Sequence, residues 1–193
     1  VQSVISLKQT FYYAKKFNRN IGNWNVSNVV TLESTFWNAV EFNADISNWN
    51  VQSVVSLRMT FSSAKRFNRD LSNWIVSSVT DMDYTFYFTC TNAQQGCNQD
   101  LSKWQVGKVT SMDSTFMQAT FFTSDLSKWQ VSNVTTFRRM FFRALTFNSE
   151  LSEWIVVSAT NLYQMFYEAE TFNSDLSKWS VSKVIYKKND FLG

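Results

Sequence analysis

Histidine and proline are both absent from this 193-residue chain, and only four glycines and two cysteines occur. Without histidine, the chain lacks the commonest general base and the commonest zinc ligand. The lack of proline and the scarcity of glycine argue against a disordered, collagen-like or linker-rich chain. No apolar run approaches the roughly 20 residues of a membrane-spanning helix, and nothing at the start resembles a signal peptide. We therefore expect no enzyme activity, no cofactor, no metal and no transmembrane segment.

The net charge of the chain is also small. The formal net charge is +3, and Lys and Arg are spread along the chain, so we expect no nucleic-acid partner. Hydrophobic residues make up 45% of the chain and aromatic residues 17%, which is ample material for a continuous core.

A repeated unit accounts for almost the whole sequence. Units have 25 residues, except the fourth, which has 30, and the last, which stops after 13. The common pattern is V-x-x-V-x-x-L/M/F-x-x-T/M-F-x-x-A-x-x-F-N-x-D-L/I-S-x-W-x. We predict a single domain over residues 1–193, with seven repeats and a partial eighth, as a piece of a longer array. The units start at Val1, Val26, Val51, Val76, Val106, Val131, Val156 and Val181.

Two periodicities lie within each unit. Apolar residues fall at unit positions 4, 7, 10 or 11, and 14, which is the spacing of one face of a short helix. In the L-S-x-W-x-V segment, Trp and the next valine alternate as in a strand. The sequence therefore predicts an α/β repeat solenoid with one short parallel strand and one short helix per unit.

The residues of this unit resemble two known repeat types. Residues 101–106 (LSKWQV) and 126–131 (LSKWQV) are similar to the L-x-x-L-x-L core of leucine-rich repeats, with Trp in the middle position. The whole unit resembles the BspA-like repeat family of cell-surface proteins, although Phe or Leu often replaces the family's Met, and Thr the first residue of its M-F pair. The resemblance implies a leucine-rich-repeat-like fold, a secreted or surface location, and adhesin-type binding of proteins.

Stacked units would align equivalent residues in columns through the core. The Trp column contains Trp24, Trp49, Trp74, Trp104, Trp129, Trp154 and Trp179, and the Phe column contains Phe11, Phe36, Phe61, Phe86, Phe116, Phe141 and Phe166. Strands pair more closely than helices pack, so we expect a curved array with strands inside and helices outside. Its strand-to-strand crossovers should be right-handed.

Two surfaces are candidates for binding a partner. The first is the outward side of the predicted strands, whose candidate residues are Asn23, Asn48, Asn50, Asn73, Ile75, Lys103, Gln105, Lys128, Gln130, Ile155 and Lys178. Amide-rich columns suit hydrogen bonding to a protein or a glycan, and the alternative is a plain solvated face. The second is an aromatic stripe on the predicted helices, whose alternative is packing between neighbouring units. Its members are Tyr12, Trp37, Tyr87, Phe142 and Tyr167.

Recurring Asn and Asp residues follow the apolar segment of each unit. They could form a row of calcium or carboxylate sites, or they could hold turns by hydrogen bonds to backbone N–H groups. Every unit uses the same pair and no glycine-rich calcium pattern lies nearby, so we favour the structural interpretation.

The fourth unit contains five extra residues between Cys90 and Cys97. A disulfide that closes this loop would indicate an oxidising, extracellular setting, whereas a pair of reduced thiols would indicate a cytosolic one. Asn25 and Asn133 match the N-glycosylation pattern, and Asn25 is the better candidate because it should point outward.

These features favour a non-enzymatic, cell-surface or secreted adhesion module that binds a protein or glycan ligand through an exposed solenoid face. The alternative is a structural subunit whose partners are neighbouring subunits of a larger extracellular or membrane-associated assembly.

Overall fold

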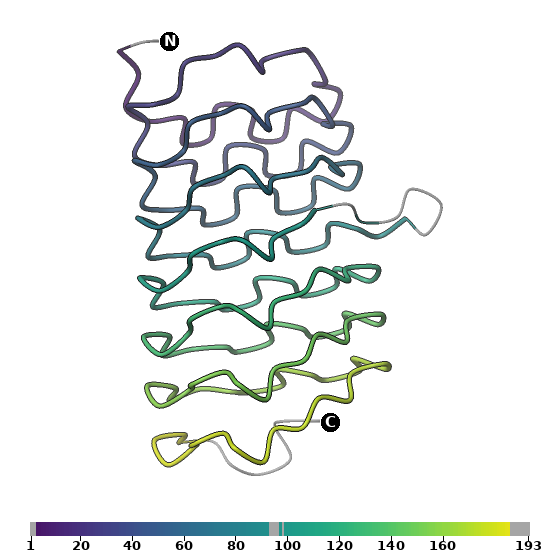
Figure 1. The fold of residues 1–193 in the computed structure, drawn as a ribbon. Coiled ribbons are helices and arrows are strands. Elements are labelled where there is room, and N and C mark those ends of the chain that lie inside the picture. Colours follow the sequence, from purple (N-terminus) through teal and green to yellow (C-terminus); the bar gives the residue numbers. More distant parts are fainter. Residues whose placement is uncertain (1–2, 93–96, 98, 186–193) are drawn as a thin grey trace.

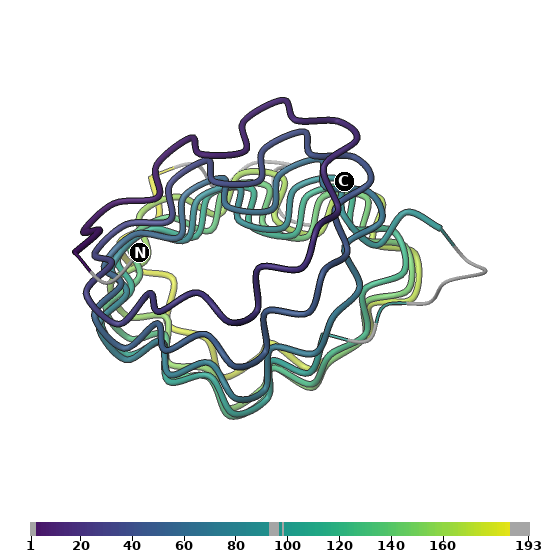
Figure 2. The same ribbon diagram turned by 90° about the horizontal axis from the view of Figure 1, so that it is seen from above.

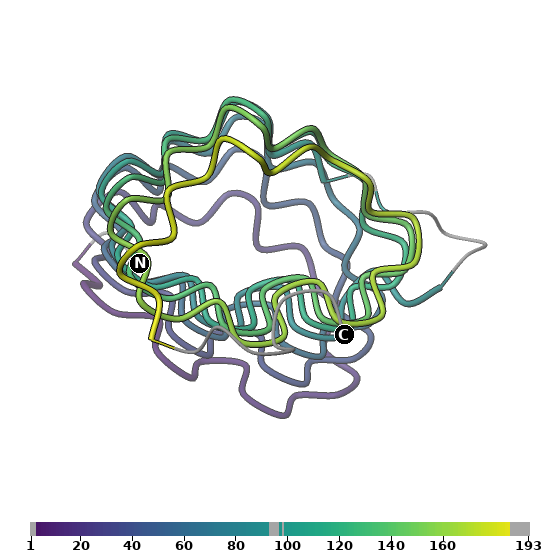
Figure 3. The ribbon, with the colours of Figure 1, turned by 90° about the horizontal axis from the view of Figure 1, so that it is seen from below.

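The computed structural model describes residues 3–92, 97 and 99–185, and the chain is wound into a stack of similar coils (Figure 1). Seen along the stack from either end, the outlines of successive coils overlay one another and shift gradually from the first to the last (Figure 2 and Figure 3). We number the coils by the sequence units: coil 1 covers residues 1–25, coil 2 26–50, coil 3 51–75, coil 4 76–105, coil 5 106–130, coil 6 131–155 and coil 7 156–180.

Neighbouring coils are joined by a thin parallel ladder. One residue of each coil forms an isolated parallel bridge with the next coil: Ser6–Thr31, Thr31–Ser56, Ser56–Asp81, Asp81–Ser111, Ser111–Thr136 and Thr136–Asn161. Beside these bridges, the Val30 N–H donates to the Ile5 carbonyl at 2.9 Å, and the Val55 N–H donates to the Val30 carbonyl at 2.8 Å. Residues one unit apart in sequence are thus direct neighbours in space.

Consecutive turns form the segment that follows each bridge. In coil 1 the N–H groups of Thr10, Tyr12 and Ala14 each donate to the carbonyl three residues earlier. The intervening N–H groups of Phe11 and Tyr13 donate to carbonyls of coil 2 instead. Two residues of each coil in this segment have positive φ, as the third residue of a type II turn requires. They are Gln9, Tyr13, Ser34, Asn38, Met59, Ser63, Tyr84, Phe88, Ser114, Gln118, Arg139, Arg143, Gln164 and Glu168.

The predicted helices are therefore wrong. A helix needs negative φ throughout and N–H bonds to the carbonyl four residues earlier, whereas positive φ recurs every fourth residue here. The apolar spacing of three and four arises because successive turns direct positions 4, 7, 11 and 14 inward. None of the described residues forms a helix long and apolar enough to cross a membrane.

The predicted strand in the L-S-x-W-x-V segment is also wrong. The alternation of buried and exposed side chains is present, but the bridges lie elsewhere, at Ser6 and its equivalents. Here coils are joined by side chains instead: the Trp49 indole N–H donates to the Ile21 carbonyl of the preceding coil at 3.0 Å. The α/β, leucine-rich-repeat-like array with inner strands and outer helices is thus not formed. The expected right-handed crossovers depended on strand–helix–strand units, which the described residues do not contain.

Aromatic columns fill the interior of the stack, as predicted. Neighbouring rings of the Phe column are stacked at 5.4–5.7 Å between centroids, and those of the Trp column at 6.2–6.5 Å from Trp24 to Trp129 and from Trp154 to Trp179. A third column contains Phe17, Phe42 and Phe67 and, beyond coil 4, Phe122, Phe147 and Phe172. Within coil 2, Phe36 also stacks on Phe42 at 3.9 Å. Aromatic packing thus runs both along the stack and across each coil.

Buried threonines satisfy backbone groups beside these rings. The Thr35 hydroxyl oxygen lies 2.9 Å from the Leu7 carbonyl oxygen of the preceding coil and 2.7 Å from that of Leu32 in its own coil. Thr60, Thr85 and Thr115 repeat the arrangement, whereas coils 6 and 7 have Met140 and Met165 at this position.

The predicted disulfide between Cys90 and Cys97 is confirmed, with their Cα atoms 5.2 Å apart. It replaces one member of the third aromatic column, between Phe67 and Phe122. The buried Gln99 fills the rest of that space, and its side-chain amide donates to the Phe67 carbonyl at 3.0 Å. Residues 93–96 of the enclosed loop lie outside the described residues.

Candidate ligand-binding face

The outward columns on either side of the buried tryptophans form one continuous surface, which we call the ligand face. It contains Asn23, Asn48, Asn73, Lys103, Lys128, Glu153 and Lys178 in one column and Asn25, Asn50, Ile75, Gln105, Gln130, Ile155 and Ser180 in the other. All of these residues are exposed, as the sequence predicted.

Local hydrogen bonds hold this face in place. In coil 2, the Ser47 N–H donates to Asp45 Oδ1 at 2.9 Å, and the Trp49 N–H closes a turn on the Ile46 carbonyl at 3.0 Å. The extended chain then directs Asn48 and Asn50 outward while Trp49 is only 2% exposed. Because the column indole of each coil from the second to the seventh donates to the preceding coil, the two outward columns keep their register along the stack.

The charge of the ligand face changes along its length. Coils 1–3 present neutral amides, whereas coils 4 and 5 present Lys103 and Lys128. In coil 7 the charge of Lys178 is neutralised by Glu153 of coil 6, because Lys178 Nζ lies 2.6 Å from Glu153 Oε1. The central part is therefore the most cationic region of the face.

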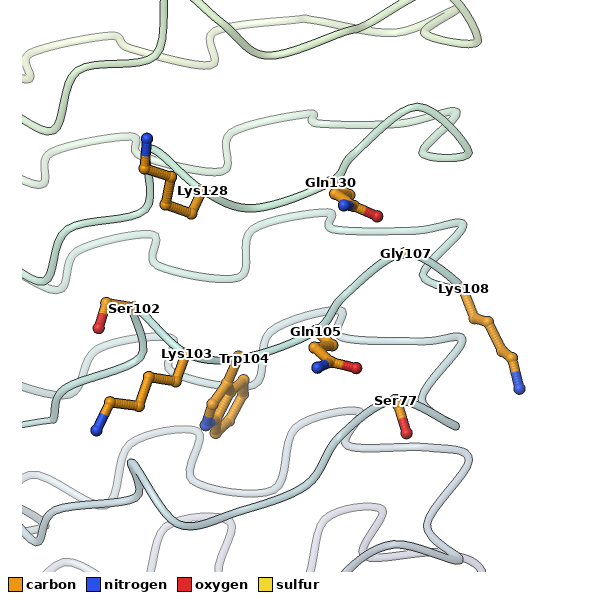
Figure 4. Close-up of a pocket in the computed structure, with 9 residues that line it drawn as sticks. All are labelled: Ser77, Ser102, Lys103, Trp104, Gln105, Gly107, Lys108, Lys128 and Gln130. Atoms are coloured by element: carbon orange, nitrogen blue, oxygen red, sulfur yellow. The ribbon is translucent and has the colours of Figure 1, made fainter.

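A groove of about 510 Å³ lies in this cationic region (Figure 4). Lys103 and Lys128 line one side and Gln105 and Gln130 the other, with Trp104 between them. The remaining lining residues are Ser77, Ser102, Gly107 and Lys108. Smaller hollows of about 340 and 200 Å³ lie at the equivalent places near Trp49 and Trp154, so the groove has the largest volume of these three.

The predicted aromatic stripe is interrupted. Tyr12 contacts Trp37 edge to face at 4.9 Å, and Phe142 stacks on Tyr167 at 4.9 Å. Tyr87 instead contacts Tyr84 of its own coil, at 5.9 Å. Packing between neighbouring coils, the alternative that the sequence left open, thus accounts for two pairs of the stripe.

The recurring Asn and Asp residues hold turns and join coils. The Asn43 N–H donates to Asn18 Oδ1 at 2.8 Å, and the Asn68 N–H donates to Asn43 Oδ1 at 3.0 Å. The N–H of Ser47 lowers the pKa of the Asp45 carboxyl, and that of Ser127 lowers the pKa of Asp125. These contacts agree with the structural interpretation. Asn98 lies outside the described residues, which contain no group of three or more acidic or cysteine side chains placed to hold a metal.

Both predicted glycosylation sites are exposed. Asn25 Oδ1 accepts hydrogen bonds from the N–H and hydroxyl of Ser27, at 3.1 and 2.8 Å. The Asn133 amide donates to the Gly107 carbonyl at 2.7 Å. The Asn133 side chain is thus exposed as well, and the nitrogen that would carry a glycan is already hydrogen-bonded.

Two surface columns seen in the structure were not predicted from the sequence. A charge column at unit position 8 pairs opposite charges one coil apart: Lys8 with Glu33 at 3.0 Å, Arg58 with Asp83 at 2.6 Å, and Arg138 with Asp113 at 3.6 Å. A β-branched column at position 5 leaves aliphatic side chains on the surface, with Ile5 65%, Val30 45% and Val55 44% exposed. Comparing residues 25 apart would have found both columns.

Comparison with known proteins gives one family. The model of a family described as "Mycoplasma protein of unknown function, DUF285" matches residues 1–96 and again residues 88–193. The two matches together span the chain. No curated protein and no solved structure matches the chain at a significant level.

Proposed function

We propose that this chain, which belongs to the DUF285 family of Mycoplasma proteins of unknown function, is a non-enzymatic binding module of the cell surface or extracellular space. The ligand face binds the partner, a protein or a glycan. The main support is that two mainly polar columns stay exposed and in register over seven coils, while the tryptophans between them are buried in coils 2–7 and partly buried in coil 1. A long, regular surface of this kind suits an extended ligand that makes many similar contacts.

Two further observations support the proposed location and role. The Cys90–Cys97 disulfide is typical of proteins in oxidising compartments. Amide side chains dominate coils 1–3 of the face, and an amide both donates and accepts hydrogen bonds. The resemblance of the repeat to BspA-like surface proteins points the same way.

Binding to immobilised glycans and purified extracellular-matrix proteins tests the proposal. Asn48→Ala combined with Asn73→Ala should weaken binding about fivefold per lost hydrogen bond, without loss of stability. Lys15→Ala is the control, because Lys15 is exposed but belongs to another column. A partner bound equally by both variants would place the binding surface elsewhere, and a full panel without a partner would contradict the proposal.

The β-branched column favours a second function, a structural subunit of a larger extracellular or membrane-associated assembly. Ile5, Val30 and Val55 are adjacent along the ladder and exposed, so they form an apolar strip that another subunit could cover. Light scattering on the purified chain separates the two functions. A monomer at micromolar concentration supports the binding module, and a larger species that Val30→Thr with Val55→Thr dissociates supports the subunit.

A further inference from the structure

The groove in coils 4 and 5 is lined by lysines that form no close ion pair, and the carboxylates of Asp100 and Asp125 act on Lys103 and Lys128 only at longer range. Among the described residues, no carboxylate oxygen lies within the 4.0 Å of an ion pair from Nζ of Lys103, Lys108 or Lys128. Lys178, in the same column as Lys103, is by contrast paired with Glu153. No carboxylate lines the groove either. Three lysines without a close ion pair thus line the hollow, which favours an anionic ligand.

Amide groups line the opposite side. The side chains of Gln105 and Gln130 lie parallel to each other, one coil apart (Figure 4). Gly107 adds no side chain to this side, and a methyl group there would make only an ordinary contact, 3.7 Å from Gln130 Oε1. An amide both donates and accepts hydrogen bonds, so this side suits the hydroxyl groups of a ligand.

The floor of the groove argues against a peptide. Trp104 is 3% exposed, and its indole N–H donates to the Leu71 carbonyl at 3.0 Å. The ring therefore offers too little exposed surface for an apolar side chain of a peptide to pack on. The lining contains no apolar pocket, and peptide recognition usually needs such pockets or an open backbone edge. The cationic and amide residues also repeat from one coil to the next, with adjacent Trp rings 6.5 Å apart. A linear ligand that repeats both anionic and hydroxyl groups matches this arrangement.

We propose that the groove between Lys103 and Lys128 on one side and Gln105 and Gln130 on the other binds an acidic oligosaccharide that carries sulfate or carboxylate groups. This inference rests on the proposed function, since it names the ligand class for one part of the ligand face. The lysines attract the anionic groups, and the glutamines bind the sugar hydroxyls and give the site its preference for a glycan.

The test measures binding of a heparin-derived octasaccharide, a hyaluronan octasaccharide and poly-L-glutamate to the whole chain. The octasaccharide with the higher charge should bind tightest, and binding should weaken as salt rises. Loss of two charge contacts of about 4 Å in water corresponds to a Kd about 30-fold weaker for Lys103→Gln combined with Lys128→Gln. Lys178→Gln is the matched control, from the same column but ion-paired, and should change the Kd less than about twofold.

Substitution of the glutamines separates a glycan site from a merely cationic patch. Gln105→Ala or Gln130→Ala should each weaken oligosaccharide binding about fivefold and leave poly-L-glutamate binding unchanged. Asn73→Lys should extend the cationic column toward coil 3 and tighten binding of both octasaccharides. Circular dichroism should show every variant folded, because all of these side chains are exposed.

Three results would overturn the inference. Poly-L-glutamate could bind as tightly as the oligosaccharides, the glutamine variants could bind like the wild type, or Lys178→Gln could lose as much affinity as the double variant. A different outcome is that no acidic oligosaccharide binds, but another glycan or matrix protein does bind and loses affinity on substitution of Asn48 and Asn73. In that case the ligand class is wrong while the proposed function stands.

Discussion

Replacing Phe116 by alanine should destabilise the stack more than the same change at its end. Phe116 is fully buried and stacks on Phe86 at 5.5 Å and on Phe141 at 5.6 Å, in the coils on either side. It also stacks on Phe122 of its own coil at 4.1 Å. The substitution therefore removes ring contacts to both neighbouring coils and leaves a cavity at the centre of the array.

The expected cost follows from these contacts. A buried Phe→Ala change costs about 3–5 kcal/mol. Phe11→Ala, the matched control, should cost about half as much, because Phe11 is partly exposed and has a described ring neighbour in only one adjacent coil, Phe36. For a chain of this size, each kcal/mol lowers the Tm by about 2–4 °C, so Phe116→Ala should lower it by about 6–20 °C.

Urea unfolding followed by tryptophan fluorescence and circular dichroism measures both costs. Each coil contacts mainly its two neighbours, so a weakened centre should also split the transition or reduce the m-value. Phe116→Leu, a milder change, keeps the comparison available if the alanine variant does not fold. Equal costs at Phe116 and Phe11 would refute the view that contacts between coils hold the stack together.

The sequence predicts what is buried better than it predicts the backbone. The 25-residue period, the Trp and Phe columns, and the outward positions of residues such as Asn48 and Lys103 all follow from side-chain polarity. Any backbone that stacks equivalent residues must bury the same positions. For this reason the columns and the exposed face were predicted correctly even though the secondary structure was not.

The turns could not be read from the residue types. Positive φ is usually signalled by Gly or Asn, but here Met59, Tyr84 and Arg139 have φ of 52–55°. Their conformation is stabilised by bonds between coils, such as the Met59 N–H to the Asp83 carbonyl at 2.8 Å. A local pattern with helical spacing does not indicate these hydrogen-bond partners, because they lie about one unit further along the chain.

The groove was predicted only in part for a related reason. Lys103, Lys128, Gln105 and Gln130 lie in the repeated columns and could be found from the period. Lys108 and Ser77 belong to other unit positions and meet these columns only where neighbouring coils turn. Placing them required the path of the backbone, which the sequence did not reveal.

Three further substitutions test separate parts of the structure. Thr60→Val removes the hydroxyl that lies 2.7 Å from the Leu57 carbonyl oxygen and should cost about 1 kcal/mol in urea unfolding, against less than about 0.5 for the exposed Thr123→Val. Replacing Cys90 and Cys97 by serine opens the short loop and should cost about 2–3 kcal/mol, and equal stability of oxidised and serine forms would contradict a structural role for the bridge. Burial raises the pKa of the Asp81 carboxyl, so the folded state holds that proton more tightly than the unfolded chain does. The wild type should therefore lose part of its stability as the pH rises through the folded pKa, and Asp81→Asn should remove this loss. Urea midpoints at pH 3.5 and pH 7 check the sign: the gain of Asp81→Asn over the wild type should be larger at pH 7, and a larger gain at pH 3.5 would mean that the ion pair with Arg58 outweighs burial.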